Sequence, residues 1–451
     1  MPAPSSTASL MATIVSLCKR RGFIFQASEI YGGIGNTYDY GPLGVELKRR
    51  VKDAWWRAMV TARADVVGLD SAIIQHPKTW ETSGHVAGFT DPLVDCKTCK
   101  ARFRADKLAE MQCPQKPSRT PLENKCDLTA PRAFNLMFKT HVGAAEDSAS
   151  VAYLRPETAQ GIFLNFKNVL EASRLKPPFG IAQIGKSFRN EITPGNFVFR
   201  MREFEQAEME FFVPPAENDK WYAHWRERRF QWYLDLGIRR EKLRIREHER
   251  DELAHYSVAT CDIEYEYPFG WGELEGIACR TDFDLKRHSE ASGVRLEFFD
   301  PDTKEHYTPF VIEPAGGIDR MALTFLIDAY AEEEVEGETR VVLRLHPRIA
   351  PITVGVFPLV KKDGMPEKAH ALEEELRELG FSTFYDEKAA IGRRYRRQDE
   401  VGTPWCVTID GDTLKDGTVT VRERDSMQQV RIPMRSVGAH LLEAQRAWPK
   451  P

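Results

Sequence analysis

Apolar runs bounded by turn-forming residues recur through the middle of the chain and predict strands. These runs are 179–188, 197–204, 207–213, 257–267 and 307–313. Several are close enough in sequence to pair as an antiparallel sheet, and the segment 316–330 has the pattern of a helix that packs on this sheet. We therefore expect an α+β fold, with an antiparallel sheet core and flanking helices on one side.

The pattern near the N-terminus predicts two amphipathic helices and then loosens. The helices span 8–21 and 43–61, and Pro42 stands near the start of the second, where its missing N–H has least effect. From 84 to about 150 the sequence reads as an insertion, and its part up to about 130 is turn-rich and contains cysteines. We expect this insertion to lie within a first domain that covers 1–345.

Beyond 345 the pattern changes to alternating strands and helices, which predicts a separate, smaller α/β domain over 346–451. The acidic and polar stretch 331–338 is expected to be a linker between the two domains. The predicted strands are 353–358, 382–385, 405–409, 418–422 and 429–432, and the predicted helices are 366–379, 392–401 and 434–447. Alternation of this kind implies a largely parallel or mixed sheet.

Composition narrows the class of protein without deciding its function. The chain has 451 residues, of which 42% are hydrophobic and 29% are charged, as in ordinary globular proteins and unlike disordered or fibrous ones. No apolar run approaches the roughly 18 residues that span a bilayer, and the N-terminus lacks the features of a signal peptide, so we expect a cytoplasmic protein with no membrane partner. A net charge of −4 leaves room for a local basic surface that binds nucleic acid.

Basic residues gather in three clusters, at 226–229, 239–250 and 393–397. We interpret the first two as solvated helix faces. The third places Tyr395 among arginines and suits single-stranded RNA, because guanidinium groups bind phosphates and a ring can stack on an unpaired base. A solvated helix face is the alternative for this cluster too.

Four of the eight cysteines lie close together, and we expect no disulfides in a chain of this size and compartment. Cys96 and Cys99 have the spacing of one half of a zinc motif, whereas Cys113 and Cys126 are spaced irregularly among prolines. Four thiolates could close a tetrahedron around Zn²⁺. We favour a metal-free insertion over a structural zinc site at these four residues.

Arginines on three separate segments predict a nucleotide site. Arg189 and Arg200 lie on segments that we interpret as antiparallel strands joined by a loop that contains Pro194. Arginine matches phosphate oxygens with a planar fork of donors, and it also lies flat on purine rings. Arg320, which follows a pair of glycines closely, adds a third guanidinium group, and Phe204 adds a ring for stacking. For any single pair, a surface hairpin with solvated ion pairs is the alternative.

Five strings of residues carry a resemblance to a known family. They are YDYGPLG at 38–44, RPETAQG at 155–161, the segment 188–212, GIA at 276–278 followed by RTD at 280–282, and VIEP at 311–314. Over nearly its whole length the chain resembles the glycyl-tRNA synthetases of the homodimeric type, which are class II aminoacyl-tRNA synthetases. The resemblance implies a homodimer, with the helix that follows Pro42 in the first class motif at the dimer interface.

The resemblance further implies that glycine attacks the α-phosphate of ATP and that the glycyl-adenylate then esterifies the terminal ribose of tRNA(Gly). Catalysis of this kind rests on positioning and charge stabilisation. Arg189 and Arg320 are the implied catalytic residues, and Glu273 matches the position that helps to hold Mg²⁺. The implied ATP-binding residues are Arg189, Asn190, Glu191, Phe199, Arg200, Met201, Arg202, Glu203, Phe204, Glu273, Leu274, Gly317, Ile318, Asp319 and Arg320.

Glycine has no side chain to grip, so its charged ends and a pocket too full for a methyl group must select it. In the family, acids crowd the ammonium group, a basic residue reaches the substrate from the insertion, and a serine usually stands where this chain has Ala315. The implied glycine-binding residues are Arg104, Glu157, Phe204, Glu205, Gln206, Ala207, Glu208, Glu313, Pro314, Ala315, Gly316 and Gly317.

The C-terminal domain resembles the anticodon-binding α/β domain that several synthetases of this class share. Two other functions stay open: a non-catalytic accessory subunit of the same dimeric architecture, and a class II synthetase for proline, threonine, serine or histidine. Retention of the three arginines with Glu191 and Phe204 favours an enzyme. The acids at Glu157 and Glu208 favour glycine over threonine, whose pocket would need zinc ligands.

Overall fold

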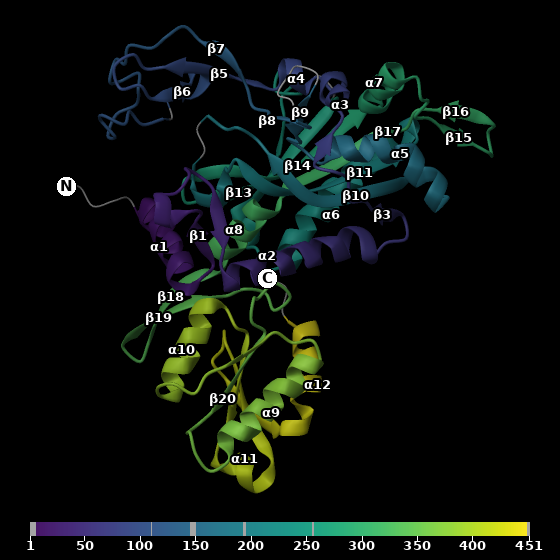
Figure 1. Cartoon of the computed structure of the whole chain (residues 1–451). Coiled ribbons are helices and arrows are strands. Elements are labelled where there is room, and N and C mark those ends of the chain that lie inside the picture. Colours follow the sequence, from purple (N-terminus) through teal and green to yellow (C-terminus); the bar gives the residue numbers. More distant parts are fainter. Residues whose placement is uncertain (1–5, 110, 145–149, 193–194, 255–256, 449–451) are drawn as a thin grey trace.

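The computed structural model describes residues 6–109, 111–144, 150–192, 195–254 and 257–448. Its largest sheet has seven strands in the order β12-β13-β14-β17-β11-β10-β3. They are β3 (Val66–Gly68), β10 (Phe179–Phe188), β11 (Glu203–Val213), β12 (Leu243–Glu247), β13 (Ala259–Tyr267), β14 (Gly270–Thr281) and β17 (Phe310–Gly317). Neighbouring strands are antiparallel, except that β10 and β3 are parallel. The predicted antiparallel core of an α+β fold is confirmed (Figure 1).

Apolar side chains alternate along β11, so the sheet has a core on each face. Met209 and Phe211 pack with residues of α2 (Pro42–Trp56), α6 (Asn218–Asp235) and α8 (Ile318–Ala329). Phe212 points the other way and packs with Phe163 of α5 (Ala159–Ser173) and Leu285 of α7 (Phe283–Ser292). Helices therefore flank both faces, and the predicted one-sided arrangement is wrong.

The N-terminal part and the insertion form smaller units beside this sheet. Their elements are α1 (Ser6–Arg21), β1 (Ile24–Gln26), β2 (Tyr38–Tyr40), β4 (Ile74–Gln75), α3 (Pro77–Thr82), α4 (His85–Gly88), β5 (Thr90–Asp95), β6 (Arg102–Arg104), β7 (Arg132–Asn135), β8 (Lys139–His141) and β9 (Val151–Leu154). Strands β4, β9 and β8 make one small sheet, and β6, β5 and β7 make another. Val94, Cys96 and Phe103 give the insertion a small core of its own. Residues 110 and 145–149 of the insertion lie outside the described residues.

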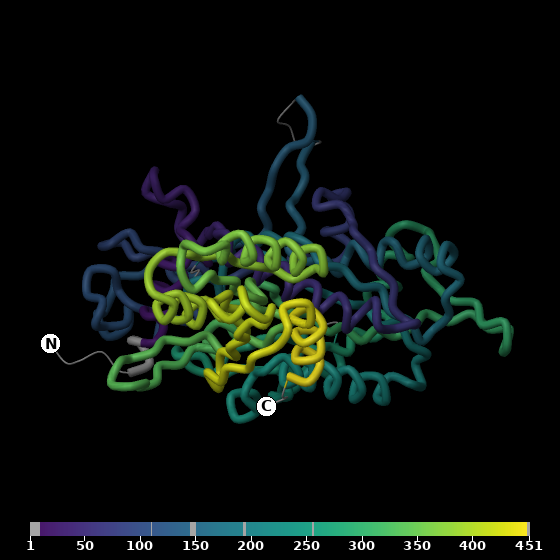
Figure 2. Tube along the Cα trace, turned by 90° about the horizontal axis from the view of Figure 1, so that it is seen from below, coloured from purple at the N-terminus to yellow at the C-terminus, as the bar shows by residue number. Residues whose placement is uncertain are grey.

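A five-stranded sheet of order β21-β20-β22-β23-β24 lies in the C-terminal part. The elements here are β20 (Val354–Pro358), α9 (Met365–Glu378), β21 (Thr383–Tyr385), α10 (Ile391–Val401), β22 (Trp405–Ile409), α11 (Gly411–Asp416), β23 (Thr418–Glu423), β24 (Gln429–Pro433) and α12 (Val437–Arg446). β21, β20 and β22 are parallel, whereas β22, β23 and β24 are antiparallel. This mixed α/β sheet, with its separate core, agrees with the prediction. Viewed from below, the C-terminal part lies across the middle of the larger part (Figure 2).

The segment predicted to be a linker is a hairpin of β18 (Tyr330–Val335) and β19 (Glu338–Leu343). Glu332 and Glu334 are exposed and alternate with less exposed residues, as in a strand. Glu333 obscures this alternation in the sequence, because it is an acid on the inner face. It pairs there with Arg340 and Arg344.

Other differences concern where elements begin. The strand predicted over 307–313 runs from Phe310 to Gly317, so Gly316 and Gly317 end β17 instead of opening a helix. Tyr307 belongs to a two-stranded sheet of β15 (Phe298–Asp300) and β16 (Glu305–Tyr307). Helix α2 starts at Pro42 and ends in a π-helical segment, Arg57–Thr61.

Of the two basic clusters interpreted as solvated helix faces, the first lies on α6 as predicted, with Arg228 exposed, but Arg229 turns inward. Arg229 on α6 is only 1% exposed, and its Nε and Nη2 lie 2.5 and 2.9 Å from the carboxylate of Glu275 on β14. The second cluster forms no α-helix: a short 3-10 helix, Arg240–Lys242, leads into β12, on which Arg244 and Arg246 pair with Glu264. Charged residues at buried or paired positions break the apolar periodicity, and so the sequence pattern did not reveal β12 or β14.

Candidate active site

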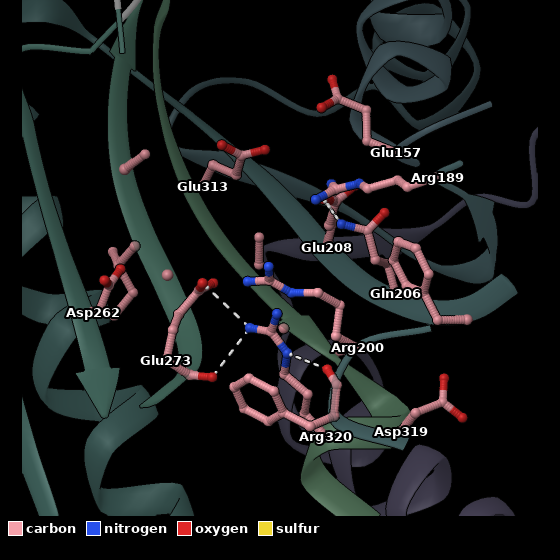
Figure 3. A pocket seen from close by; sticks show the side chains of 18 of the residues that line it. Glu157, Arg189, Arg200, Gln206, Glu208, Asp262, Glu273, Glu313, Asp319 and Arg320 are labelled. Atoms are coloured by element: carbon pink, nitrogen blue, oxygen red, sulfur yellow. Dashed lines mark hydrogen bonds and ion pairs between the residues drawn. The ribbon is translucent and has the colours of Figure 1, made fainter. Parts of the chain in front are cut away.

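A cavity of about 320 Å³ opens on one face of the seven-stranded sheet. Alternate residues of three adjacent strands line it, namely Gln206 and Glu208 of β11, Gly276, Ala278 and Arg280 of β14, and Glu313, Ala315 and Gly317 of β17. The loop between β10 and β11 and the start of α8 supply further walls. Figure 3 shows three acids around Arg189 at one end of the cavity, and Arg200, Arg320 and Glu273 at the other.

Arg189 and Arg200 lie in the loop that joins β10 to β11, and not on the strands as predicted. β11 starts only at Glu203. The backbone turns at Asn196 and the residue after it, whose φ angles of 56° and 59° are left-handed, so this part of the segment 197–204 cannot pair with β10. Pro194, which the prediction placed in the turn, lies outside the described residues.

Arg320, at the start of α8, is held in a fixed orientation. Its Nε donates to the carbonyl of Phe199 at 3.0 Å, and its guanidinium carbon lies 4.4 Å from the centre of the Phe199 ring. Its Nη1 lies 3.1 Å from the carbonyl oxygen and 3.2 Å from the carboxylate of Glu273. Burial would raise the pKa of Glu273, but Arg320 more than offsets this, so that the pKa lies below its usual value. Arg320 therefore keeps the Glu273 carboxylate ionised.

Arg189 stands between the two ends of the cavity. Its Nε donates to the carbonyl of Pro156 at 3.0 Å, and its guanidinium carbon lies 5.4 Å from the ring centres of both Phe89 and Phe204. With Arg200 and Arg320 it makes three guanidinium groups that line one cavity. This arrangement suits an anionic ligand such as a chain of phosphates.

Ten of the fifteen predicted ATP-binding residues line the cavity, namely Arg189, Glu191, Phe199, Arg200, Met201, Phe204, Glu273, Gly317, Asp319 and Arg320. The other five, Asn190, Arg202, Glu203, Leu274 and Ile318, are not part of its wall. Leu274 and Ile318 are buried in the main core. Arg202 donates to the backbone of Gly35 and Glu191, and Glu203 pairs with Lys186.

Three carboxylates gather at the other end of the cavity, and each has different partners. Glu157 lies 3.2 Å from His85 Nε2 and accepts from Gln160 at 3.0 Å. Glu208 accepts from Thr158 N at 2.8 Å, and Glu313 accepts twice from Arg280, at 3.0 and 2.9 Å. His85 and Arg280 are functional candidates that the sequence analysis missed, because each meets its carboxylate only through the fold.

The surroundings of these acids set different pKa values. Burial would raise the pKa of Glu157, but His85 and then Arg280 bring it well below its usual value. Burial raises the pKa of Glu208, and the negative charge of Glu157 adds to the rise. Burial also raises the pKa of Glu313 to about 8, although Arg280 acts against it. One firmly ionised carboxylate thus stands beside two that hold their protons more tightly.

The predicted glycine-binding residues divide in the same way. Those that line the cavity are Glu157, Phe204, Gln206, Glu208, Glu313, Ala315, Gly316 and Gly317. Arg104, Glu205, Ala207 and Pro314 are not part of its wall. Along β11 and β17 the side chains alternate between faces, so an unbroken run such as 205–208 cannot point entirely into one pocket. Arg104 pairs with Asp91 and Asp106 within the insertion, and Glu205 pairs with Lys48 and Lys52.

A second carboxylate, which the sequence analysis did not single out, stands near Glu273. An oxygen of Asp262 and one of Glu273 lie 3.7 and 3.9 Å from the point where a Cβ on Gly276 would stand. Burial and the charge of Glu273 raise the pKa of Asp262. Two oxygen donors beside a glycine fit a hard divalent cation, which takes one or two carboxylates together with substrate phosphates. Among the described residues, no group of three or more His, Cys, Asp or Glu side chains could hold a metal ion.

All eight cysteines have free thiols. In the insertion, the sulfur atoms of Cys113 and Cys126 are 3.7 Å apart, and the backbone N–H of Cys99 donates to Cys96 Sγ at 3.5 Å. The irregularly spaced pair is therefore brought together by the fold. Whether the insertion is free of metal stays a prediction.

The basic cluster at 393–397 lies on α10, where most of it is engaged in contacts within the chain. Arg394 is 2% exposed and donates to the carbonyl groups of Pro358, Leu359 and Asp386. Tyr395 bonds to Thr408 through its hydroxyl group. Arg393 is exposed. The predicted RNA-binding surface is therefore reduced, and Arg394 and Tyr395 support the fold instead.

An antiparallel sheet with a cavity of guanidinium groups and carboxylates on one face, followed by a smaller α/β sheet, defines a class II aminoacyl-tRNA synthetase. A family model described as "Anticodon binding domain" matches residues 353–444. The glycine–tRNA ligase of Caldanaerobacter subterraneus subsp. tengcongensis is 55% identical over 454 residues, which cover 96% of this chain and 98% of the relative. Those of Alkaliphilus oremlandii and Treponema denticola are each 55% identical, over 97% and 94% of this chain and 99% and 94% of the relatives. The chain belongs to the glycine–tRNA ligase family.

Among the described residues, the helices are all too short or too polar to cross a membrane.

Proposed function

We propose that this chain joins glycine to the terminal ribose of tRNA(Gly) in two steps that consume ATP. In the first step, a carboxylate oxygen of glycine attacks the α-phosphorus of ATP, and pyrophosphate leaves as glycyl-adenylate forms. In the second, a ribose hydroxyl group attacks the glycyl carbonyl carbon, its proton is released, and AMP leaves. The observation that carries this proposal is one cavity with three carboxylates at one end, Arg200 and Arg320 at the other, and Arg189 beside the carboxylates.

The arginines would bind ATP and stabilise the charge that develops during the first step. Arg189 lies between the two ends of the cavity and would contact the α-phosphate, where glycine and ATP meet (Figure 3). Arg200 and Arg320 would hold the outer phosphates. Phe204 offers a ring on which adenine can stack, and Glu191 offers an acceptor for the amino group of adenine.

The acids would bind the ammonium group of glycine. Glu157 is the carboxylate kept most firmly ionised, and Glu208 and Glu313 face the same space. A glycine ammonium group placed among them would orient the carboxylate of glycine towards Arg189. Ala315 lines this end with a methyl group, where the family usually has a serine.

A divalent cation, expected to be Mg²⁺, would sit where Glu273 and Asp262 meet and would neutralise charge on the outer phosphates. Glu273 is about half exposed, so it is open to a ligand. The two carboxylates would orient the cation, while Arg320 keeps Glu273 ionised.

The oligomeric state and the domain boundaries complete the proposal. We propose a cytoplasmic homodimer with a catalytic domain at 1–345 and an anticodon-binding domain at 346–451. The match to an anticodon-binding family over 353–444 supports tRNA as the partner of the second domain.

ATP–pyrophosphate exchange with glycine, alanine, serine, proline or threonine tests this function. We expect exchange with glycine alone. The Arg189→Ala variant should lose about two to three orders of magnitude in exchange rate, as expected when one donor to a transition-state charge is removed. Arg377→Ala is the control, because Arg377 is 59% exposed on α9 in the C-terminal part and does not line the cavity. Exchange with none of the amino acids by a folded wild-type protein would contradict the proposal.

A further inference from the structure

His85 belongs to the insertion, yet it reaches the acid end of the cavity. It opens α4, and its Nε2 lies 3.2 Å from a carboxylate oxygen of Glu157. The two side chains are only 13% and 14% exposed. Glu157 is one of three neighbouring acids. His85 Nε2–H bonds to its Oε2 and Gln160 bonds to its Oε1, and together they fix the orientation of the carboxylate and the lone pairs left for a ligand.

The second nitrogen of the ring is also occupied. Nδ1 lies 2.8 Å from Ser83 Oγ, and the same oxygen lies 3.4 Å from the carbonyl oxygen of Trp80. Because Nε2 faces a carboxylate, the network assigns its proton to Nε2, and the Ser83 hydroxyl group then donates to Nδ1 of the neutral ring. In the imidazolium form, Nδ1–H donates to Ser83, whose own proton turns towards Trp80. The Nε2–H bond to Glu157 therefore persists in both protonation states.

Packing holds the ring in this orientation. The edge of Trp80 lies against one side, with ring centres 5.6 Å apart, and Phe89 lies 5.4 Å away. Asn135 on β7 donates to the carbonyl oxygens of His85 and Val86 at 3.1 and 2.9 Å, which ties the backbone of α4 to β7, elsewhere in the insertion. Phe89 in turn lies beneath Arg189. The insertion thus contacts both the acid end of the cavity and the central arginine.

We propose that His85 is a positioning residue for the amino acid substrate. It fixes the orientation of the Glu157 carboxylate towards the ammonium group of glycine, so the seating of the insertion sets the affinity of the site for glycine. This inference rests on the proposed function, and it adds a residue that acts through Glu157 without touching the reacting atoms.

Two substitutions of His85 distinguish the effect of its hydrogen bond from the effect of its volume. His85→Gln places an amide N–H near the position of Nε2, whereas His85→Leu fills a similar volume with no donor. We expect His85→Leu to raise the KM for glycine by about 10- to 100-fold in ATP–pyrophosphate exchange, with the KM for ATP within about twofold, because a hydrogen bond to a charged group is lost. His85→Gln should restore the KM for glycine to within a few-fold of wild type. Ser83→Ala, which frees the ring to turn, should raise it by a few-fold.

His141→Leu is the matched control. His141 also bonds to a serine through Nδ1, at 2.9 Å from Ser150 Oγ, but it lies exposed on β8. This variant should leave both KM values unchanged. The positioning role is wrong if His85→Leu leaves the KM for glycine unchanged. It is also wrong if the KM values for glycine and ATP rise equally and His85→Gln does not restore them. In both cases the proposed function stands. A wild-type protein without glycine-dependent exchange overturns both.

Discussion

Arg280 Nη1 lies 3.0 and 2.9 Å from the two carboxylate oxygens of Glu313. The same guanidinium group uses Nε and Nη2 to bind Asp284, at 2.8 and 3.0 Å. All three side chains are nearly inaccessible, with 3% of Arg280, 8% of Glu313 and 2% of Asp284 exposed. One guanidinium group therefore binds two buried acids, and it fixes the position of Glu313, which lines the cavity.

Replacing Arg280 with Met should destabilise the protein strongly. The variant leaves the buried Asp284 carboxylate without its cation and Glu313 without its donor, and breaking a buried pair in this way costs about 3–5 kcal/mol in the free energy of unfolding. Urea unfolding measures this difference. Arg102→Met is the control, because Arg102 is 69% exposed and its substitution should change stability by less than about 0.5 kcal/mol. Equal unfolding midpoints for the two variants would show that Arg280 is dispensable for the fold.

Glycine binding should strengthen as the pH rises towards 8. The pKa of Glu313 is raised to about 8, so near neutral pH this group is mostly protonated, and it must lose its proton to attract an ammonium group. The KM for glycine should therefore fall by roughly tenfold between about pH 6.5 and about pH 8. Pyrophosphate exchange at several pH values measures it. In Glu313→Gln the KM for glycine should be higher and nearly independent of pH. A pH-independent KM in the wild-type protein is the contrary result.

Glu210→Gln should stabilise the protein, and more so at higher pH. Glu210 is fully buried on β11, and within the described part of the chain its two carboxyl oxygens have no hydrogen-bond partner. Burial and the nearby Glu313 raise its pKa well above 4.5. In the unfolded chain the group ionises as the pH passes 4.5, while in the folded protein it stays protonated, so the wild type loses stability as the pH rises.

Glutamine does not titrate, so the advantage of the Glu210→Gln variant should be small near pH 4 and grow towards pH 8. Urea unfolding across this range shows the trend. Glu305→Gln, at an exposed position on β16, should show no such trend. A constant difference between Glu210→Gln and wild type at every pH would mean that Glu210 titrates alike in both states.

The two neighbouring arginines on α10 should have opposite phenotypes. Arg394→Met leaves three carbonyl groups without their donor and should lower the free energy of unfolding by about 2–4 kcal/mol, with tRNA binding per folded molecule unchanged. Arg393→Ala removes an exposed charge and should leave stability within about 0.5 kcal/mol. It should weaken tRNA binding at low salt, because an exposed guanidinium group on this face is available to a phosphate. Filter binding and thermal unfolding of both variants test the contrast, and a loss of tRNA affinity confined to Arg394→Met would reverse the assignment.

The sequence reveals those parts of the fold in which local pattern and burial agree. The strand at 179–188 and that at 405–409 have the predicted limits, because their apolar runs are bounded by clear turn residues. β14 carries Glu273 and Glu275 among glycines and has no such run. Its inner acid, Glu275, is neutralised by Arg229 from α6, a partner 46 residues earlier in the chain. Local periodicity cannot report a charge that is compensated from so far away.

The site was predictable in its residue types and less so in its geometry. The three arginines could be found from their segments, and they do line one cavity. The face on which each neighbour lies depends on strand register, which is why Glu208 points into the cavity while Ala207 lies in the core. His85, Asp262 and Arg280 were missed because each is defined by a carboxylate distant in sequence.

The order of strands in the large sheet has a consequence for how the protein is made. β17 lies between β11 and β14, but it is the last of the seven strands to leave the ribosome. Until residues 310–317 are synthesised, β11 and β14 each present an unpaired edge, and the two halves of the cavity have nothing to join them. A nascent chain that stalls before residue 310 exposes two strand edges whose backbone N–H and C=O groups are unpaired. We therefore expect translation pauses before residue 310 to favour aggregation over folding.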